Sequence, residues 1–321
     1  MVGLVADIGS TNARFALVEK ADPATAPVLA HTASFICAEY ASLADVMAAY
    51  LKDRPPHQKP DRATLAVAGP ISGDRVRLTN HNWAFSVTET RTQFELTHLH
   101  VINDFTAISL SLPHLPAAAL AVIGPAMMTA DPRCVGVLGP GSGLGVGGLL
   151  RLDGRYVPLS SEGGHMSFAP TTEMEINLAR ILFRRFGHVS NERLLSGPGL
   201  IHIYEALNGL SNRTGRALDA KQIVDDALRQ NDTACVETLD HFCAILGGVA
   251  GDLAMMLNAE AIYVAGGIVP RFIDFLRASR FRAQFENKGR FAARLAQVAT
   301  PVIVEPNPGL LGAAVDLSQM E

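Results

Sequence analysis

Asn103 and Asp104 follow directly after the apolar run "LHVI" and stand before the segment "FTAISLSL". A carboxylate at the end of a buried strand has two ordinary uses. It either caps the first turn of the helix that follows, or it takes a proton from a bound hydroxyl group. The local sequence leaves both alternatives open for Asp104.

Three further side chains are suited to binding a polyhydroxyl compound, namely Glu162 and His165 in "SSEGGHMSF" and Glu192 in "SNERLLSG". Carboxylates, amides and imidazoles match sugar hydroxyls, because each hydroxyl both donates and accepts a hydrogen bond. Each residue also has a structural alternative. Glu162 before Gly-Gly is compatible with a turn acid, His165 with a hydrogen-bonded core histidine, and Glu192 with a favourable charge near the start of a short helix.

Three glycine-rich turns follow apolar segments that predict strands. They are "ADIGSTN" (6–12), "LGPGSGLG" (138–145) and "VAGGIV" (264–269). In such turns the backbone N–H groups point at an anion without a Cβ in the way. Ser10, Thr11 and Ser142 add hydroxyl donors. One such turn is commonly an ordinary loop, but three in one chain predict phosphate binding.

Two familiar phosphate motifs do not fit. The chain has no G-x-x-x-x-G-K-[ST] segment, which excludes a P-loop. Gly143, Gly145 and Gly148 match G-x-G-x-x-G, but the following "LLRLDGRYV" predicts a strand. A dinucleotide site needs a helix at that point to face the pyrophosphate.

The elements that must position these residues alternate between strands and helices. Segment 2–19 predicts a hairpin, because an apolar run, a Gly/Ser/Thr/Asn turn and the alternating "ARFALV" follow one another. Apolar runs predict further strands near 62–70, 99–104, 134–139, 261–269 and 300–305, and helical spacing predicts helices over 41–51, 170–187, 197–207, 236–258 and 308–317. The class is therefore α/β with two lobes.

Two details of the predicted helices are specific. Thr172 and Glu175 are spaced as a capping box at the start of the 170–187 helix. Gly247, Gly248 and Gly251 would let another element approach the 236–258 helix closely. A Pro-bounded connection after about residue 110 predicts the domain boundary, with a small domain over 1–110 and a large one over 111–321.

Composition excludes several classes of protein. The chain has 321 residues, 48% hydrophobic and 18% charged, which supports a large core rather than disorder. A net charge of -4 without a Lys/Arg run argues against nucleic acid. No basic leader and no run of about 18 uninterrupted apolar residues is present, so we expect neither a signal peptide nor a membrane span. Four scattered cysteines predict small buried residues in a reducing cytoplasm, not a zinc site.

Together, these motifs resemble bacterial glucokinase, the ATP-dependent type within the sugar-kinase/actin/heat-shock ATPase superfamily. The resemblance runs nearly end to end and includes several segments of six or more matching positions. They are "ADIGSTNARFAL", "AVAGPISGDRVRLTNHNW", "VINDFTAIS", "GPGSGLGV", "EGGHMSFAP", "NERLLSGPGLIHIYEAL", "VAGGIVPRF", "RFRAQFENKGRF" and "NPGLLGAAV".

This resemblance implies a two-lobed actin-like ATPase fold of the ribonuclease H-like type, with a central cleft and the C-terminal helix, about 306–321, packed back on the small domain. It implies that ATP and Mg²⁺ are used to phosphorylate D-glucose at its 6-hydroxyl for glycolysis. A homodimer in the cytoplasm is the family expectation.

The resemblance also assigns roles to particular residues. Asp104 matches the catalytic base, and Asn103, Glu162, His165 and Glu192 match the residues that hold the other sugar hydroxyls. Phosphate and adenosine contacts are expected from Asp7, Gly9, Ser10, Thr11, Asn12, Gly139, Gly141, Ser142, Gly143, Gly266 and Gly267, with Asp7 near Mg²⁺ through water.

The chain departs from the family pattern in its phosphate turns. Ser10 stands where a second glycine is usual, so a positive φ there would strain it. Ser142 replaces a frequent Thr and keeps the hydroxyl, while Pro140 removes one backbone donor. A kinase for another hexose such as mannose or fructose is the nearest alternative. A sugar-sensing regulator would need a DNA-binding domain, and the hairpin begins at residue 4.

Overall fold

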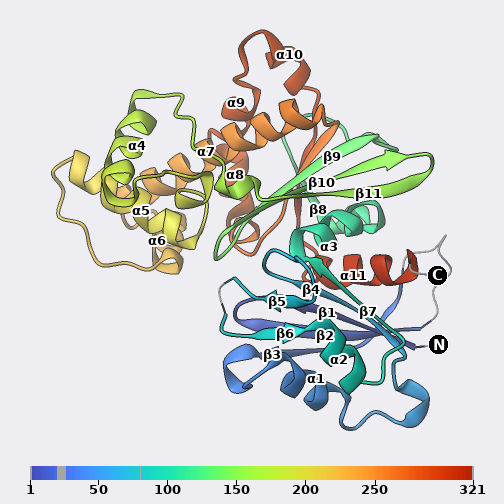
Figure 1. Cartoon of the computed structure of the whole chain (residues 1–321). Coiled ribbons are helices and arrows are strands. Elements are labelled where there is room, and N and C mark those ends of the chain that lie inside the picture. The colour runs from blue at the N-terminus through green and yellow to red at the C-terminus, as the bar shows by residue number, and fades with distance from the viewer. Residues whose placement is uncertain (1, 20–26, 80, 320–321) are drawn as a thin grey trace. The chain divides into compact units, whose positions relative to one another are not determined.

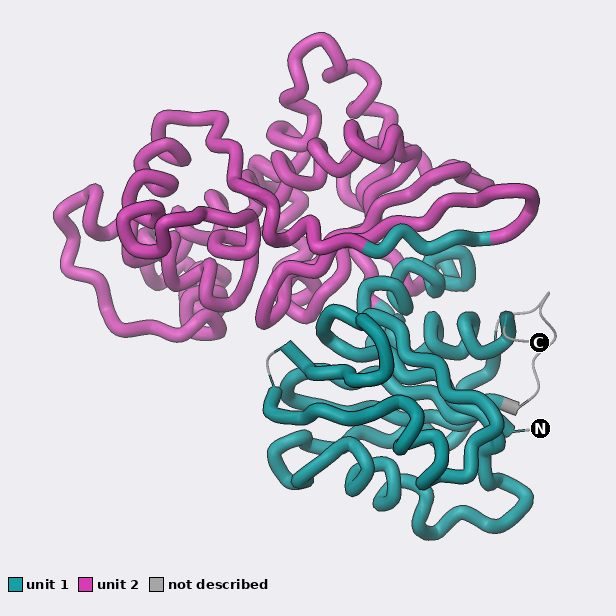
Figure 2. Tube along the Cα trace, viewed as in Figure 1, with its two compact units in different colours: residues 1–117, 156–160, 305–321 teal, residues 118–155, 161–304 magenta. Residues whose placement is uncertain are grey.

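The computed structural model describes residues 2–19, 27–79 and 81–319 of the chain. It divides into two units, coloured separately in Figure 2. Unit 1 holds residues 1–117, 156–160 and 305–321, and unit 2 holds residues 118–155 and 161–304. The chain thus leaves unit 1 after residue 117, near the expected boundary at about 110, and returns to it at 156–160 and again at 305. The last two residues of the segment expected at 306–321 lie outside the described residues.

The five-stranded sheet of unit 1 has the order β3-β2-β1-β4-β7. Its strands are β1 (Val2–Ile8), β2 (Asn12–Glu19), β3 (Leu29–Ile36), β4 (Arg62–Val67) and β7 (His98–Asn103). β1 and β2 form the predicted antiparallel hairpin, and β1, β4 and β7 are parallel neighbours. The carboxyl ends of β1 and β7 carry the "DIG" and "IND" segments, and strands in register bring such ends to one edge of a sheet.

Four helices and a short hairpin complete unit 1 (Figure 1). They are α1 (Leu43–Leu51), α2 (Val87–Gln93), α3 (Asp104–Ser111), α11 (Pro308–Gln319), and the antiparallel pair β5 (Arg75–Arg77) and β6 (Ala84–Ser86). The helix predicted over 41–51 is confirmed, with Ser42 as its N-cap. Its apolar face enters a core built around Phe15, Leu65 and Trp83.

The C-terminal helix α11 lies unusually close to α3. A Cβ built on Gly312 would lie 1.6 Å from the carbonyl oxygen of Ala107, so only glycine allows this crossing. One turn earlier, a Cβ on Gly309 would lie 2.8 Å from the carboxyl carbon of Asp7. The two glycines therefore bring one helix against both the Asp104 helix and the Asp7 turn.

The six-stranded sheet repeats the strand order of the first sheet, and all of it except residues 156–160 belongs to unit 2. Its order is β11-β10-β9-β12-β13-β8. The strands are β8 (Leu120–Ile123), β9 (Cys134–Pro140), β10 (Leu144–Leu152), β11 (Arg155–Ser161), β12 (Ala261–Val264) and β13 (Thr300–Ile303). In each sheet three strands that are consecutive in the chain lie side by side, β1 to β3 in the first and β9 to β11 in the second. Two later strands then extend the sheet parallel to β1 or β9, and β8 adds an antiparallel edge to the second sheet. The glycine-rich turns 8–12 and 140–144 thus join equivalent pairs of strands.

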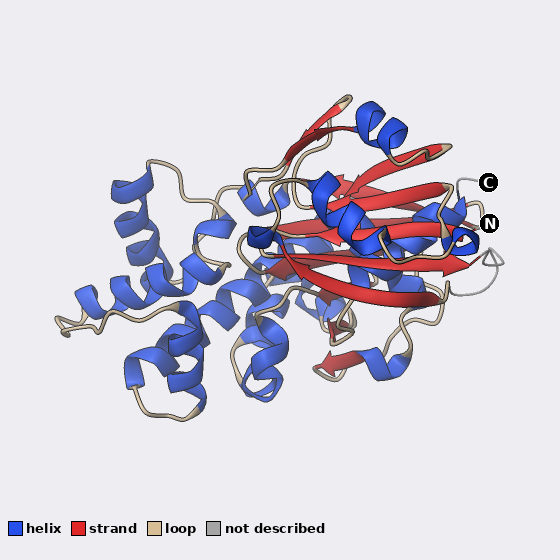
Figure 3. Ribbon diagram, turned by 90° about the horizontal axis from the view of Figure 1, so that it is seen from below, coloured by secondary structure: helices blue, strands red, loops and turns tan. Residues whose placement is uncertain are grey.

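Unit 2 also contains helices. Figure 3 shows many of them beside the strands and connected to one another by loops. They are α4 (Glu173–Phe186), α5 (Gly197–Leu210), α6 (Ala220–Leu228), α7 (Thr233–Leu257), α8 (Ile273–Ala278), α9 (Phe281–Glu286) and α10 (Ala292–Leu295). The close approach predicted for α7 is confirmed at two of its glycines. Cβ atoms on Gly247 and Gly251 would lie 2.0 and 2.5 Å from the carbonyl oxygens of Phe281 and Phe285 in α9.

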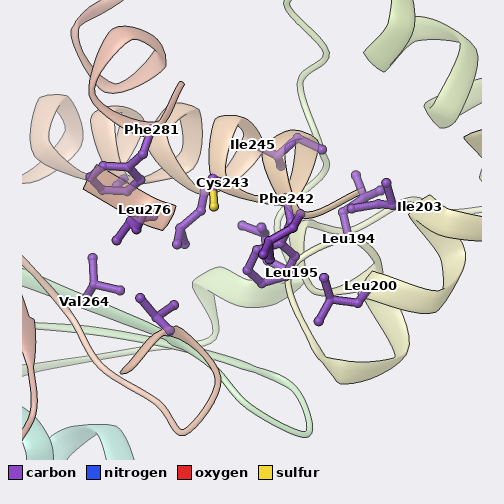
Figure 4. Packing of buried hydrophobic residues seen from close by; sticks show 14 of the residues in the cluster. Leu194, Leu195, Leu200, Ile203, Phe242, Cys243, Ile245, Val264, Leu276 and Phe281 are labelled. Atoms are coloured by element: carbon purple, nitrogen blue, oxygen red, sulfur yellow. The ribbon is translucent and has the colours of Figure 1, made fainter. Parts of the chain in front are cut away.

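α7 is the core helix of unit 2. Figure 4 shows Phe242 and Cys243 of this helix among Leu195, Leu276 and other buried side chains. By length and composition α7 is the one described helix apolar enough to cross a membrane, yet 61% of its apolar window is buried inside the protein. Burial of this kind is typical of a core helix. All four cysteines are free and buried, as their scattered positions predicted.

The predicted capping box at α4 is only half correct. Thr172 accepts a hydrogen bond from the backbone N–H of Glu175 at 3.2 Å, as predicted. The Glu175 carboxylate, however, turns to Thr171 and accepts both its backbone N–H and its hydroxyl, at 2.6 and 2.9 Å. Thr171 thus supplies both donors to the carboxylate, in place of the N-cap backbone N–H that a capping box requires.

A histidine–carboxylate pair ties α11 to the sheet of unit 1. Nδ1 of His100 on β7 lies 2.7 Å from Oδ2 of Asp316 on α11, and Thr64 on β4 donates to the same oxygen at 3.0 Å. The hydrogen bond to Asp316 raises the pKa of His100 above its ordinary value, and partial burial opposes this. A raised pKa means that the pair stabilises the fold fully below the unfolded pKa of about 6.5 and loses this effect as pH rises through the folded pKa.

We expect His100→Asn to lower the melting temperature more at pH 6 than at pH 8.5. The difference at pH 6 should be on the order of 1–3 °C, because half of the His100 side chain is exposed and solvent weakens the pair. Thermal unfolding of both proteins from pH 5.5 to 8.5 measures this. A loss that is equal at every pH would show that the pair does not titrate as described.

Candidate active site

Asn103, not Asp104, caps helix α3. The Asn103 carbonyl Oδ1 accepts the backbone N–H groups of Phe105 and Thr106 at 2.8 and 3.3 Å, and its Nδ2 donates to the carbonyl oxygen of Gly69 at 3.2 Å. The helix starts at Asp104, one residue earlier than the "FTAISLSL" segment suggests. Of the alternatives left open by the sequence, the capping role belongs to Asn103.

This arrangement fixes the position of Asp104. The residue lies in the first turn of α3, and its Oδ1 accepts the backbone N–H of Phe105 at 3.0 Å. Asp104 is only partly buried, while Phe105 and Thr106 beside it are buried. A carboxylate on a rigid helical turn, next to a capped N-terminus, is well placed to orient a polar ligand.

In unit 2 the structure brings together three of the predicted sugar-binding residues. His165 lies between two carboxylates, with Nε2 4.0 Å from Oε2 of Glu162 and Nδ1 4.0 Å from Oε1 of Glu192. Glu162 and His165 lie at the two ends of η5 (Gly163–His165), and Glu192 belongs to η6 (Asn191–Arg193). His165 is well exposed, so the core-histidine alternative is wrong. Glu162 and His165 are exposed, and Glu192 is partly exposed.

Glu192 also holds the second glycine-rich turn. Its Oε2 accepts the backbone N–H of Leu144 at 2.9 Å, directly after the turn. A second bond connects the same segments, because the N–H of Gly197 donates to the carbonyl oxygen of Gly141 at 2.9 Å. A Cβ on Gly143 would lie 2.4 Å from Oε2 of Glu192. The Glu192 carboxylate therefore lies beside His165 and holds the turn at the same time.

The first glycine-rich turn is held by its own backbone. The N–H of Gly9 donates to the carbonyl oxygen of Asn12 at 3.0 Å. The N–H of Cys37 donates to the carbonyl oxygen of Thr11 at 2.9 Å. Within the described residues, the backbone N–H groups of Ser10 and Thr11 donate to no other residue. These groups provide donors for an anion.

Ser10 adopts an ordinary backbone conformation. Neither Gly9 nor Ser10 is among the described residues with positive φ. The strain considered for Ser10 is therefore not present. The hairpin turns here without the left-handed residue that would have required a second glycine.

Asp7 lies partly buried at the end of β1. Burial raises the pKa of Asp7 above its ordinary value, and the charge and hydrogen bond of Arg14 oppose this. Arg14 Nη1 lies 3.3 Å from Asp7 Oδ2. Arg14 was not among the residues predicted from the sequence. The register of the predicted hairpin could have identified Arg14, because Asp7 and Arg14 face each other across its two strands.

The third glycine-rich turn lies against the second. Gly266 has φ of 86°, and a Cβ on it would lie 2.3 Å from the carbonyl oxygen of Pro140. The N–H of Ala265 donates to the carbonyl oxygen of Leu138 at 2.8 Å. Gly267 and Ser142 are exposed. Unit 2 therefore holds residues 139–143 and 265–267 side by side, and glycine is required at 266.

Comparison with known proteins identifies the class of this arrangement. A crystal structure of glucokinase from an Antarctic psychrotroph superposes with a TM-score of 0.88, at 39% identity over 99% of both chains. A ROK family glucokinase from Streptomyces griseus, solved with glucose and AMPPNP, superposes with a TM-score of 0.65 at 18% identity, over 100% of both chains. The chain thus has the two-domain actin-like ATPase fold of sugar kinases, as expected.

The family is shown by sequence. The model of the glucokinase family matches residues 4–320. The glucokinase of Aromatoleum aromaticum is 44% identical over 315 residues, which cover 98% of this chain and 94% of the relative. The chain belongs to the glucokinase family, whose members phosphorylate glucose with ATP.

The contact between Gly143 and Glu192 gives a prediction about stability. We expect Gly143→Ala to lower the free energy of unfolding by about 1–3 kcal/mol, because the new methyl group displaces a hydrogen-bonded carboxylate. Gly141 lies in the same turn, and a Cβ there meets no atom within 4 Å. Gly141→Ala should therefore change stability by less than about 0.5 kcal/mol. Urea unfolding of both variants compares them, and equal losses would contradict the steric account.

Proposed function

We propose that the chain transfers the γ-phosphate of ATP to the 6-hydroxyl of D-glucose with Asp104 as general base. The observation that supports this proposal is that Asn103, not Asp104, caps the start of α3. Asn103 satisfies the helix N-terminus, so the carboxylate beside it is not required as the cap. The proton of the 6-hydroxyl moves to Asp104 while the hydroxyl oxygen attacks the γ-phosphorus, and ADP leaves.

The remaining sugar contacts are assigned by hydrogen-bonding chemistry. Asn103 uses Oδ1 in capping, so its Nδ2 is the group that donates to a sugar oxygen. Glu162 and Glu192 accept from hydroxyls, and His165 between them both donates and accepts. Alternating acceptors and donors of this kind select the orientation of each hydroxyl.

Phosphate binding is assigned to the glycine-rich turns. Gly9, Ser10, Thr11 and Asn12 line the first, Gly139, Gly141, Ser142 and Gly143 the second, and Gly266 and Gly267 the adenosine turn. The N–H groups of Ser10 and Thr11 support this, because they donate to no described residue. Since phosphoryl transfer leaves little covalent work to a protein, these donors act by placing and neutralising the phosphates.

Mg²⁺ fits the donor set at Asp7. Magnesium retains several waters and uses one or two carboxylates together with substrate phosphates. Among the described residues no group of three or more His, Cys, Asp and Glu side chains could hold a metal alone, and magnesium bound in this way needs none. When bound, it supplies positive charge to the β- and γ-phosphates. Asp7 would hold it through water, with Gly309 at its back and Arg14 at its side.

The homodimer and the cytoplasmic location stay predictions, as does the absence of nucleic-acid and membrane partners. ADP release with glucose, mannose and fructose tests the sugar assignment. We expect strong turnover on glucose. Comparable turnover on another hexose alone would retain the mechanism and overturn the choice of sugar.

We expect Asp104→Asn to lower kcat by roughly 10²–10⁴ while glucose still binds. The amide keeps the size of the side chain but cannot take the proton. Coupled ADP release gives kcat, and calorimetry without nucleotide gives the glucose affinity. Asp53→Asn, an exposed site in unit 1, is the control for a lost carboxylate and should retain wild-type turnover. Near-wild-type kcat in Asp104→Asn would refute its role as base.

We expect Glu162→Gln and His165→Asn each to raise the KM for glucose by roughly 5–150-fold, because a sugar hydroxyl loses its partner. The KM for ATP should change much less. Glu173→Gln is the matched control, since Glu173 is an exposed carboxylate on the same unit. Unchanged glucose KM in both site variants would show that these residues do not hold the sugar.

A further inference from the structure

A cavity of about 220 Å³ lies behind the sugar-binding segment of unit 2. Gly163 and Met166 form part of its wall, and they flank His165 in the chain. The opposite wall is α7, the long helix in Figure 1. The cavity thus lies inside one unit, and the residues that line it include none of the turn glycines at 9, 139, 141, 143, 266 and 267.

The floor of the cavity is apolar and has room because of one glycine. Leu138 and Val146 contribute from β9 and β10, and Ile245 and Val249 from α7, where Figure 4 labels Ile245. Gly248 lies between the two α7 residues, and a Cβ on it would meet no atom within 4 Å. The space is therefore not filled by side chains, as a core normally is.

The rim of the cavity carries a buried acceptor. Glu175 is 3% exposed and uses Oε2 for both of its hydrogen bonds to Thr171. Its Oε1 accepts no hydrogen bond from any described residue and is not among the buried unsatisfied oxygens, so it retains accessible surface. A carboxylate oxygen in this state favours an N–H donor.

The charges of the rim exclude one class of ligand. Lys288 Nζ lies 2.6 Å from Asp252 Oδ1, so this cation is already paired. Glu175 then adds a negative charge, and the lining holds two carboxylates against one ammonium group. An anionic ligand would meet net repulsion here, whereas a neutral or cationic one would not.

We propose that this cavity is a second ligand site, which takes a small planar bicyclic compound with an N–H donor and no negative charge. An apolar cavity of about 150 Å³ holds one benzene ring. The larger volume here, about 220 Å³, leaves room for a fused second ring. The rings lie on the apolar floor beside Gly248, and the N–H donates to Oε1 of Glu175.

Occupancy of the cavity acts on the sugar-binding residues. The N–H of Met166 donates to the carbonyl oxygen of Gly163 at 3.2 Å, and the N–H of Asn191 donates to that of Met166 at 2.9 Å. These bonds join Gly163 and Met166 in the wall of the cavity to each other and to Asn191, and His165 and Glu192 are the chain neighbours of Met166 and Asn191. A ligand that supports this wall changes glucose affinity, and glucose changes the affinity of the ligand by the same factor. This second part rests on the proposed sugar role of His165 and Glu192.

Benzimidazole is the probe, and indole-3-carboxylate is the anionic comparison. We expect benzimidazole to bind the full chain with a dissociation constant on the order of 0.1–1 mM, and indole-3-carboxylate at least tenfold more weakly. Calorimetry without ATP measures both. Gly248→Met should fill the cavity, raise the melting temperature and abolish binding. Gly209→Met is the matched control, because Gly209 is an exposed helical glycine whose Cβ also meets no atom within 4 Å.

The outcomes separate the site from its coupling. Binding lost in Gly248→Met and retained in Gly209→Met supports the site, and an accompanying shift in glucose affinity of threefold or more supports the coupling. No binding to the wild type, or binding that survives Gly248→Met, overturns the site. Binding without any shift in an intact glucose affinity overturns the coupling alone. If glucose itself does not bind, the proposed function fails while the calorimetry with benzimidazole still tests the site.

Discussion

The crossing of α11 over α3 is the contact on which unit 1 depends. Gly312 approaches the carbonyl oxygen of Ala107 so closely that no larger residue fits, and Gly309 does the same at the Asp7 carboxylate. A change at either glycine would move the helix that starts at Asp104 or the end of β1 that carries Asp7. The C-terminal helix therefore fixes the proposed base Asp104 and the proposed magnesium residue Asp7 relative to each other, although both are remote from it in the sequence.

In unit 2 the side chain of Glu192 holds the glycine-rich turn in place. Glu192 accepts the N–H of Leu144 after the second phosphate turn and lies 4.0 Å from His165. Gly143 leaves the room that this carboxylate needs. Because the strand order of the first sheet recurs in the second, the turns 8–12 and 140–144 join equivalent strands. Backbone bonds between Gly9 and Asn12 and between Cys37 and Thr11 hold the first turn, and the Glu192 carboxylate holds the second.

The sequence predicted the elements well because their signals are local. The hairpin, the α1 and α7 helices and the strands after which the glycine turns come all follow from apolar periodicity and turn residues. Two local choices were less certain, since Asn103 and Asp104 both suit an N-cap and Thr171 and Thr172 both suit Glu175. The bond from Leu144 to Glu192 and the space beside Gly248 depend on packing between distant segments, which no local pattern encodes. The contact of Arg14 with Asp7 is intermediate between local and long-range signals, because the register of the predicted hairpin is enough to pair the two residues.

The cavity beneath residues 162–166 bears on the proposed binding of sugar by this segment. Gly163 and Gly164 are buried, yet Glu162, His165 and Met166 next to them are exposed. A segment between solvent and a cavity makes fewer packing contacts than one seated on a filled core, so its local opening costs less free energy. The backbone bonds that join Met166 to Gly163 and to Asn191 oppose that opening. Under the proposed roles, a sugar that contacts Glu162, His165 and Glu192 together would oppose it further, because opening would then break the contacts with the sugar.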